Sequence, residues 1–177
     1  QAYDSTGATV AGETIINNYT GIQEQPEIVV FSDNKFLVVW QGEGSYGAYD
    51  DKGIFAQYRN ADGTADGTAF IVNQTTVNEQ SGPSVAAMSD GSIMICWQSN
   101  LQDASKFGVY CRIYGPDHAP VGAEFKVNNF TTNDQKYPYV TAFKSDWFAV
   151  VWYSDTQASS LGPYLRRYSK EGYKIYR

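Results

Sequence analysis

The feature that most constrains this chain is a unit of about 55 residues that recurs three times along the sequence. In each copy a tryptophan stands fourteen residues after a proline, and successive copies are offset by 57 and 55 residues. The prolines are Pro26, Pro83 and Pro138, and the tryptophans are Trp40, Trp97 and Trp152. Such a period is typical of repeat architectures. We expect one repeat domain over 1–177, with units at 14–69, 70–124 and 125–177, and 1–13 ending a preceding unit.

Each unit predicts four short β-strands separated by turns rich in Ser, Asp, Asn and Gly, and no segment has helical periodicity. The first strand is expected directly after the proline, at 27–31, 84–88 and 139–143. The second strand ends at the tryptophan, at 36–40, 93–97 and 148–152. The third follows a polar loop, at 53–59, 108–114 and 162–168, and the fourth is expected at 14–17, 69–73 and 124–128.

The second strand of each unit is apolar on both of its faces. In the first copy Phe36, Val38 and Trp40 point to one side, while Leu37 and Val39 point to the other. A strand with one face in solvent would alternate apolar and polar residues. We therefore expect an all-β fold of tandem four-stranded antiparallel sheets, each lying between two others like the blades of a β-propeller. A linear β-stack and a two-sheet β-sandwich are the alternatives.

Several short segments repeat a common pattern. They are Val127-Asn128, Gln80, Pro83, Val85, Ser89-Asp90-Gly91, Val38-Val39-Trp40-Gln41 and Val121-Gly122-Ala123-Glu124-Phe125. Over nearly the whole chain this pattern resembles a family of long tandem-repeat proteins of bacteria and protists that are predicted to be secreted. The resemblance implies repeated β-sheets and says almost nothing about activity. The third copy departs from the pattern, because Tyr153 follows Trp152 and the final V-G-x-E-F segment is missing.

The predicted strands are out of phase with the ends of the chain. A fourth strand at 14–17 precedes the first full unit, and the last unit lacks its fourth strand. Unpaired sheet edges can accept a strand from another molecule. We therefore hypothesise a non-enzymatic extracellular or cell-surface structural protein that assembles head-to-tail with copies of itself. Alternatives are a segment of a larger adhesin and a lectin-like propeller that binds glycans through Tyr46, Tyr49 and Phe107.

Charge and composition exclude several classes of function. A net charge of −6 argues against nucleic-acid binding, and no apolar run is long enough for a membrane span. With one histidine, His118, and no nucleophile motif, we expect no catalytic residues, no metal site and no cofactor. The acidic residues that can nevertheless be considered for Ca²⁺ are Glu43, Asp50, Asp51, Asp62 and Asp66; the alternative is that such residues cap hairpin turns.

Two further sets of residues are candidates for covalent modification. Asn18, Asn73 and Asn129 each begin an N-x-S/T sequence, so they are candidate glycosylation sites at turns after a predicted strand. The same residues also suit turns without a glycan. Cys96 and Cys111 lie on neighbouring predicted strands of the second copy. They are either a disulfide across the hairpin or two small buried residues.

Overall fold

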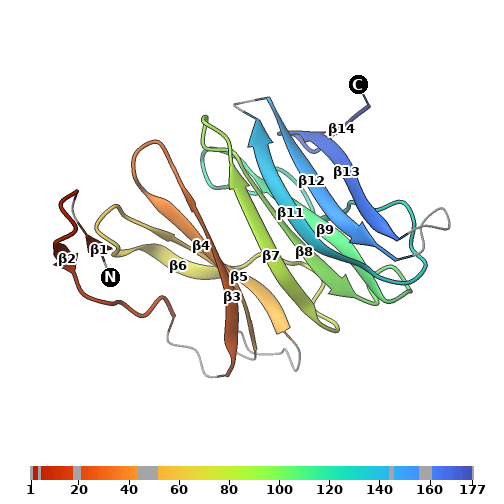
Figure 1. Cartoon of the computed structure of the whole chain (residues 1–177), viewed down its shortest axis with the longest axis horizontal. Coiled ribbons are helices and arrows are strands. Elements are labelled where there is room, and N and C mark those ends of the chain that lie inside the picture. The colour runs from red at the N-terminus through yellow and green to blue at the C-terminus, as the bar shows by residue number, and fades with distance from the viewer. Residues whose placement is uncertain are drawn as a thin grey trace.

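The computed structural model describes residues 2–3, 5–17, 21–43, 52–143, 146–155 and 161–176, and within these ranges the regular secondary structure consists of β-strands. The strands form three four-stranded antiparallel sheets and one two-stranded hairpin (Figure 1). We call the sheets blades 1, 2 and 3 in chain order. In each blade the strands lie side by side in their order along the chain.

The strand bounds follow the repeat. Blade 1 contains β3 (Gln23–Val30), β4 (Phe36–Glu43), β5 (Lys52–Arg59) and β6 (Ala65–Ile71). Blade 2 contains β7 (Gln80–Ala87), β8 (Ile93–Asn100), β9 (Phe107–Tyr114) and β10 (Phe125–Lys126). Blade 3 contains β11 (Gln135–Phe143), β12 (Trp147–Ser154), β13 (Gly162–Ser169) and β14 (Lys174–Ile175). The hairpin pairs β1 (Ala2–Tyr3) with β2 (Thr9–Ala11).

The first strands of the three blades lie next to one another. Strand β7 contacts both β3 and β11, and the blades fan out from these inner strands (Figure 1). This arrangement confirms the prediction of tandem antiparallel sheets stacked like propeller blades. A two-sheet sandwich would have needed only one buried face per sheet, whereas blade 2 is covered on both sides.

The inner strands begin earlier than expected, at the glutamine that precedes the proline. The prediction placed the strand start after the proline, because proline has no backbone N–H to donate to a sheet. Each strand instead passes the proline in a β-bulge, for example between Glu24 and Glu27. The residue before each proline has a left-handed backbone; its φ angle is 50° at Gln25, 61° at Gly82 and 55° at Tyr137. The bulge therefore keeps the strand in the sheet despite the proline.

The fourth strands also differ from their predicted positions. Strand β6 ends at Ile71 and β10 covers only Phe125–Lys126, so neither reaches the asparagine that follows. Residues 12–17, where a strand was expected at 14–17, are irregular, and the strand in this segment is β2. The asparagines leave the ladder because their side chains make other hydrogen bonds, described below.

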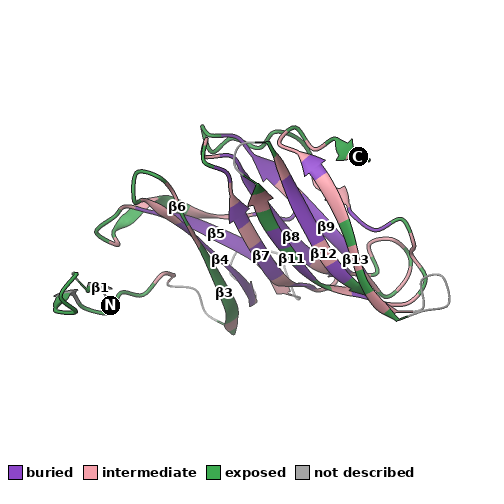
Figure 2. Cartoon of the chain, turned by 45° about the horizontal axis from the view of Figure 1, so that its top comes forward, coloured by how far each residue is buried: buried purple, intermediate pink, exposed green. Residues whose placement is uncertain are grey.

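Two apolar clusters hold the blades together. One joins blades 1 and 2 and contains Trp97, Leu37 and Ile54; the other joins blades 2 and 3 and contains Phe148 and Trp152. Strand β8 contributes to both clusters, which confirms the prediction that the second strand is buried on both faces (Figure 2). All three repeat tryptophans are buried, and among the repeat prolines Pro83 and Pro138 are buried while Pro26 is exposed.

Candidate functional site

The inner strands carry a repeated side-chain network at the end where they begin. Between blades 1 and 2 the backbone N–H of Ile54 donates to Asn73 Oδ1 at 2.8 Å, and Asn73 Nδ2 donates to Gln80 Oε1 at 3.2 Å. Gln80 in turn donates to the carbonyls of Val77 and Asn78. The equivalent amide pairs are Asn128–Gln135, at 3.2 Å, and Asn17–Gln23, at 3.3 Å. This network fixes the loop that crosses from one blade to the next.

The network bears on the candidate glycosylation sites. Asn73 is only 2% exposed and its amide nitrogen donates to two acceptors, Thr75 O and Gln80 Oε1. A glycan on Asn73 is incompatible with this arrangement. Asn129 is exposed, and its Oδ1 accepts from Arg166, so a glycan there stays a prediction. Asn18 lies outside the described residues.

A second repeated element joins neighbouring blades through a glutamine that follows the tryptophan. Gln41 Oε1 accepts a hydrogen bond from the Gly82 N–H at 2.9 Å, and Gln41 Nε2 donates to Glu24 Oε2 at 3.0 Å. The same geometry recurs one blade further on. There Gln98 Oε1 accepts from the Tyr137 N–H at 3.1 Å, and Gln98 Nε2 donates to Ser81 Oγ at 3.2 Å. We call this element the glutamine latch.

Charged residues gather at this end of blades 1 and 2. Lys52 Nζ lies 2.8 Å from Glu24 Oε2. The hydrogen bond from Lys52, followed by that from Gln41, holds the pKa of Glu24 below its usual value. The hydrogen bond to Glu24 raises the pKa of Lys52 despite partial burial, and the charges of Glu79 and Glu43 act in the same direction. Lys52 therefore pairs directly with Glu24, lies opposite Glu43 in register, and also feels the charge of Glu79.

The corresponding end of blades 2 and 3 is built from different residues. Asp134 Oδ1 accepts from the Phe107 N–H at 3.3 Å, and Asp134 Oδ2 lies 3.3 Å from Lys136 Nζ. The same ammonium group lies 4.4 Å from the centre of the Phe107 ring, within the range of a cation–π contact. Glu24, Lys52, Glu79, Phe107, Asp134 and Lys136 together are called the polar end.

The polar end differs from the amide network because most of its residues change from blade to blade, although the acidic residue before the repeated glutamine recurs as Glu79 and Asp134. Glu24 pairs in register with Gln41, and the equivalent residues opposite the latch position are Ser81 in blade 2 and Lys136 in blade 3. Residues that maintain the fold recur in every blade, whereas a binding site needs particular residues at particular blades. Of this set, the sequence had pointed only to Phe107. The signal that could have identified the rest is a position of the repeat that carries a different residue in each copy, as Glu24, Ser81 and Lys136 do.

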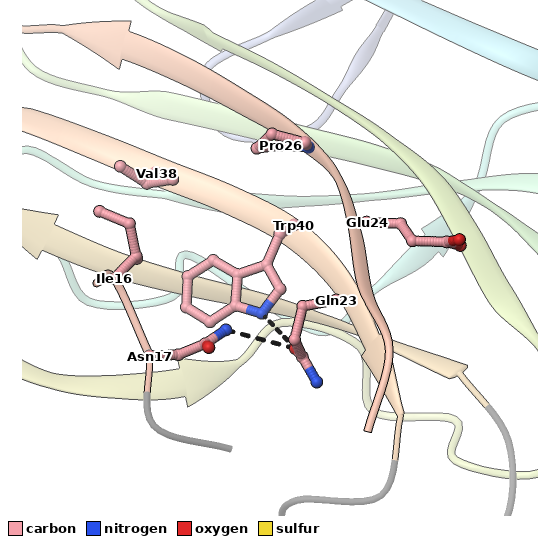
Figure 3. Close-up of a pocket in the computed structure, with 7 residues that line it drawn as sticks. All are labelled: Ile16, Asn17, Gln23, Glu24, Pro26, Val38 and Trp40. Carbon is pink, nitrogen blue, oxygen red and sulfur yellow. Dashed lines mark hydrogen bonds between the residues drawn. The ribbon is translucent and has the colours of Figure 1, made fainter. Parts of the chain in front are cut away.

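A small cavity lies beside the polar end on the outer face of blade 1. Its volume is about 200 Å³, and it is bounded by the Trp40 ring, Ile16, Val38 and the side chains of Asn17 and Gln23 (Figure 3). The indole N–H of Trp40 donates to Gln23 Oε1 at 2.9 Å. The cavity thus combines a flat aromatic surface with amide groups.

The acidic residues considered for Ca²⁺ make other contacts. Asp62 accepts from the backbone and hydroxyl of Thr64, which lowers the pKa of Asp62, and Asp66 lies 2.9 Å from Lys35. Asp50 and Asp51 lie outside the described residues. In the part of the chain that is described, no three acidic, cysteine or histidine side chains gather as a metal site. The described residues also contain no helix long and apolar enough to cross a bilayer.

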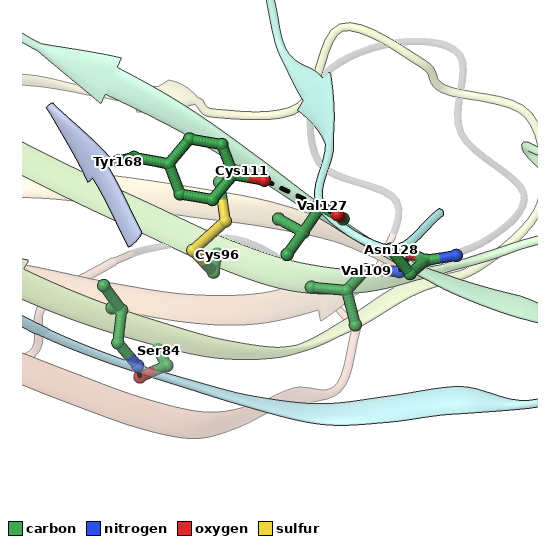
Figure 4. The surroundings of a disulfide bond; sticks show 8 residues. Ser84, Cys96, Val109, Cys111, Val127, Asn128 and Tyr168 are labelled. Atoms are coloured by element: carbon green, nitrogen blue, oxygen red, sulfur yellow. Dashed lines mark hydrogen bonds between the residues drawn. A yellow bond between two sulfur atoms is a disulfide. The ribbon is translucent and has the colours of Figure 1, made fainter. Parts of the chain in front are cut away.

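The two cysteines form a disulfide within blade 2. Cys96 and Cys111 face each other in register on β8 and β9, and the bond lies in the cluster between blades 2 and 3 (Figure 4). Tyr168 of blade 3 and Val127 belong to the same cluster. Blade 1 has Val39 and Ala56 at the paired positions and packs against blade 2 without a disulfide there. The bond is therefore particular to blade 2.

Comparison with known proteins places the fold. No protein-family model and no curated protein matches the chain. Solved structures that it resembles include an endo-arabinase from Bacteroides thetaiotaomicron, with a TM-score of 0.54 and 13% identity over 98% of this chain and 63% of that one. An α-L-arabinanase from Penicillium chrysogenum complexed with arabinobiose has a TM-score of 0.55 and 14% identity over 80% and 44% of the two chains. A family-93 α-L-arabinofuranosidase from Fusarium graminearum, also with arabinobiose, has 0.55 and 15% over 86% and 48%.

These comparisons correct the functional prediction. The chain spans about half the length of the solved structures that it resembles. They are glycoside hydrolases with a β-propeller fold, so the prediction of a non-enzymatic, self-assembling structural protein is wrong. Tyr153 of blade 3 stands at the position that Gln41 and Gln98 occupy in the other two blades.

Proposed function

We propose that this chain forms part of a carbohydrate-active β-propeller that hydrolyses glycosidic bonds at the polar end, with Glu24 and Glu79 as the reacting carboxylates. The observation that carries the proposal is the set of carboxylates that act on Lys52: Glu24, which lies 2.8 Å from its ammonium group, and Glu79 on the segment that leads into blade 2. These carboxylates lie at the end where the inner strands begin, and all three blades contribute residues to this end. The resemblance to arabinan-degrading hydrolases supports the reaction class.

Glycoside hydrolysis uses two carboxyl groups on opposite sides of the bond that is cleaved. One must be ionised to act as base or nucleophile, and the other must deliver a proton to the leaving oxygen. Glu24 suits the first role, because Lys52 and Gln41 both donate to its carboxylate and lower its pKa. Glu79, half-buried on the neighbouring blade, takes the second role.

The surroundings of the carboxylates fit a neutral sugar. Sugar-binding sites combine apolar ring surfaces with a few well-placed polar groups. The half-buried Phe107 ring at the polar end supplies such a surface, and the amides of Asn17 and Gln23 line the adjacent cavity. The excess of carboxylates disfavours an acidic polysaccharide. We therefore propose an uncharged, arabinose-containing glycan as the substrate class.

Hydrolysis of arabinan by the purified chain tests the proposal. Release of reducing ends is measured for the wild type and for Glu24→Gln, Glu79→Gln and Glu27→Gln. Glu27 is an exposed carboxylate on the same strand as Glu24, so it serves as the matched control. We expect each of the first two variants to lose activity by about 10²-fold or more, as removal of a proton-transfer group does, and Glu27→Gln to retain it. Binding of arabino-oligosaccharides without any release of reducing ends would contradict the proposal.

A further inference from the structure

We propose that Gln41 is a positioning residue that orients the Glu24 carboxylate and couples its ionisation to the junction between blades 1 and 2. The inference rests on the proposed function only in treating Glu24 as a reacting group. Gln41 itself touches neither a substrate nor the reacting atoms; it acts through Glu24.

The orientation of the Gln41 amide is determined by its partner on blade 2. A backbone N–H can only donate, so the group that faces the Gly82 N–H must be the amide oxygen. The NH₂ group of Gln41 is then turned toward Glu24 Oε2, 3.0 Å away. Gln41 is only 3% exposed, so its amide is held in the junction, whereas the Glu24 side chain that it contacts is exposed.

The partner on blade 2 is itself held in place. Gly82 lies in the β-bulge of β7 with a φ of 61° and is followed by the buried Pro83. The proline restricts the backbone before it, and the left-handed φ suits glycine. The direction of the Gly82 N–H is thus a property of the blade 2 backbone, and it is transmitted through one side chain to the carboxylate on blade 1.

The second latch shows what Gln41 does beyond joining blades. Gln98 accepts from the Tyr137 N–H and donates to Ser81, a neutral residue, with the same geometry. The latch is therefore a general device of the repeat, and only the first copy is linked to a carboxylate. This pair of latches provides a control within the same molecule.

Other charged groups also act on Glu24, and they must be separated from the effect of Gln41. Lys52 of β5 contacts the carboxylate directly. The charges of Glu43, at the end of β4, and of Glu79, before β7, also act on Lys52. Removing the Gln41 donor leaves the Lys52 attraction intact. The expected change is therefore a partial loss of carboxylate stabilisation.

The test measures the titration midpoint of the Glu24 carboxyl carbon by NMR in the full chain, assigned with the help of Glu24→Gln. We expect Gln41→Leu to move the midpoint to higher pH. Gln41→Glu can still accept from the Gly82 N–H but brings a second carboxylate to Glu24, so it should move the midpoint further. The matched variants Gln98→Leu and Gln98→Glu should leave the Glu24 midpoint unchanged.

Two results would overturn the inference. One is an unchanged Glu24 midpoint in both Gln41 variants, and the other is an equal shift in the Gln98 variants, which would mean general loosening of the blades. Gln41→Glu keeps the latch, so the test remains available where Gln41→Leu fails to fold. The measurement does not depend on activity: a chain that fails to hydrolyse arabinan but shows the expected shifts would overturn the proposed function and leave this role of Gln41 standing.

Discussion

Blades 1 and 2 are built from the same repeat but lie in different surroundings. Blade 2 lies between two other blades, and its inner strand is made of small or neutral residues such as Ser81, Gly82 and Ser84. Within the described residues blade 1 packs against blade 2 alone, and Ile28 and Val30 on its inner strand are 58% and 61% exposed. The difference separates two kinds of constraint. The glutamine, proline and tryptophan that recur in each repeat are required by the fold, whereas the residues between them depend on whether a blade faces a neighbouring blade or solvent.

The largest expected contrast between the two blades is in the tryptophans. Trp97 is fully buried between blades 1 and 2, so Trp97→Ala should cost about 4 kcal/mol of unfolding free energy. Trp40 belongs to a smaller cluster on the outer face of blade 1, next to a cavity. Trp40→Ala should therefore cost clearly less. Urea unfolding of both variants at neutral pH checks this, and equal losses would mean that the size of the surrounding apolar cluster has no energetic weight.

The disulfide gives the next contrast, because blade 1 makes the same hairpin without it. Replacing Cys96 by Val and Cys111 by Ala copies the Val39–Ala56 pair of blade 1. The bond closes a loop with a sequence separation of 15, for which about 3 kcal/mol of stabilisation is expected. The loss is measured by urea unfolding against the oxidised wild type. Alkylation of both cysteines in the native, unreduced chain would contradict the presence of the bond.

The amide network should show a smaller difference in stability loss, again with the larger loss at the more buried residue. Asn73→Ala removes the acceptor of the buried Ile54 N–H and the donor to Gln80 Oε1, at a cost of about 2 kcal/mol. Asn17 is half-buried, and the equivalent change Asn17→Ala should cost less. Calorimetric melting of the two variants makes the comparison. A lower melting temperature for Asn17→Ala than for Asn73→Ala would be inconsistent with the burial described here.

Tyrosines buried at the blade junctions should make the stability of the chain depend on pH in the alkaline range, and this effect is the most gradual of those expected. Burial raises the pKa of Tyr58, Tyr110, Tyr114 and Tyr168 above the usual value of 10.0. A raised folded-state pKa means that the stabilisation is complete below pH 10 and is lost as pH rises above it, because only the unfolded state then releases the protons readily. Absorbance at alkaline pH should show these four buried tyrosines ionising only as the chain unfolds. A single common transition without loss of structure would contradict this.

The fold was largely predictable from the sequence because its determinants are local and repeated. The apolar faces of 36–40 and 93–97 required sheets on both sides, and the structure has them for blade 2. The strand starts were misplaced because the bulge at residues such as Gln25 depends on a left-handed backbone that non-glycine residues rarely adopt. Asn73 resembled a modification site because only the folded chain shows that Ile54 and Gln80 occupy its amide.

The candidate site was not predictable in the same way. Glu24, Glu79 and Asp134 lie in three different repeats, and each is unremarkable among its sequence neighbours. They share one end of the molecule only because the inner strands of the blades run side by side. A site built in this way has no contiguous motif, so the absence of a motif in the sequence does not exclude one.

The location of glycan binding is the most direct test of the polar end as a sugar-binding site. A titration of the ¹⁵N-labelled chain with arabinobiose reports on each backbone amide. We expect the largest chemical-shift changes at the amides of the polar end, in particular Gly82, Phe107 and Tyr137, whose N–H groups contact its side chains or the adjoining latches. Shifts confined to the opposite ends of the blades, such as the turn at His118, would contradict it.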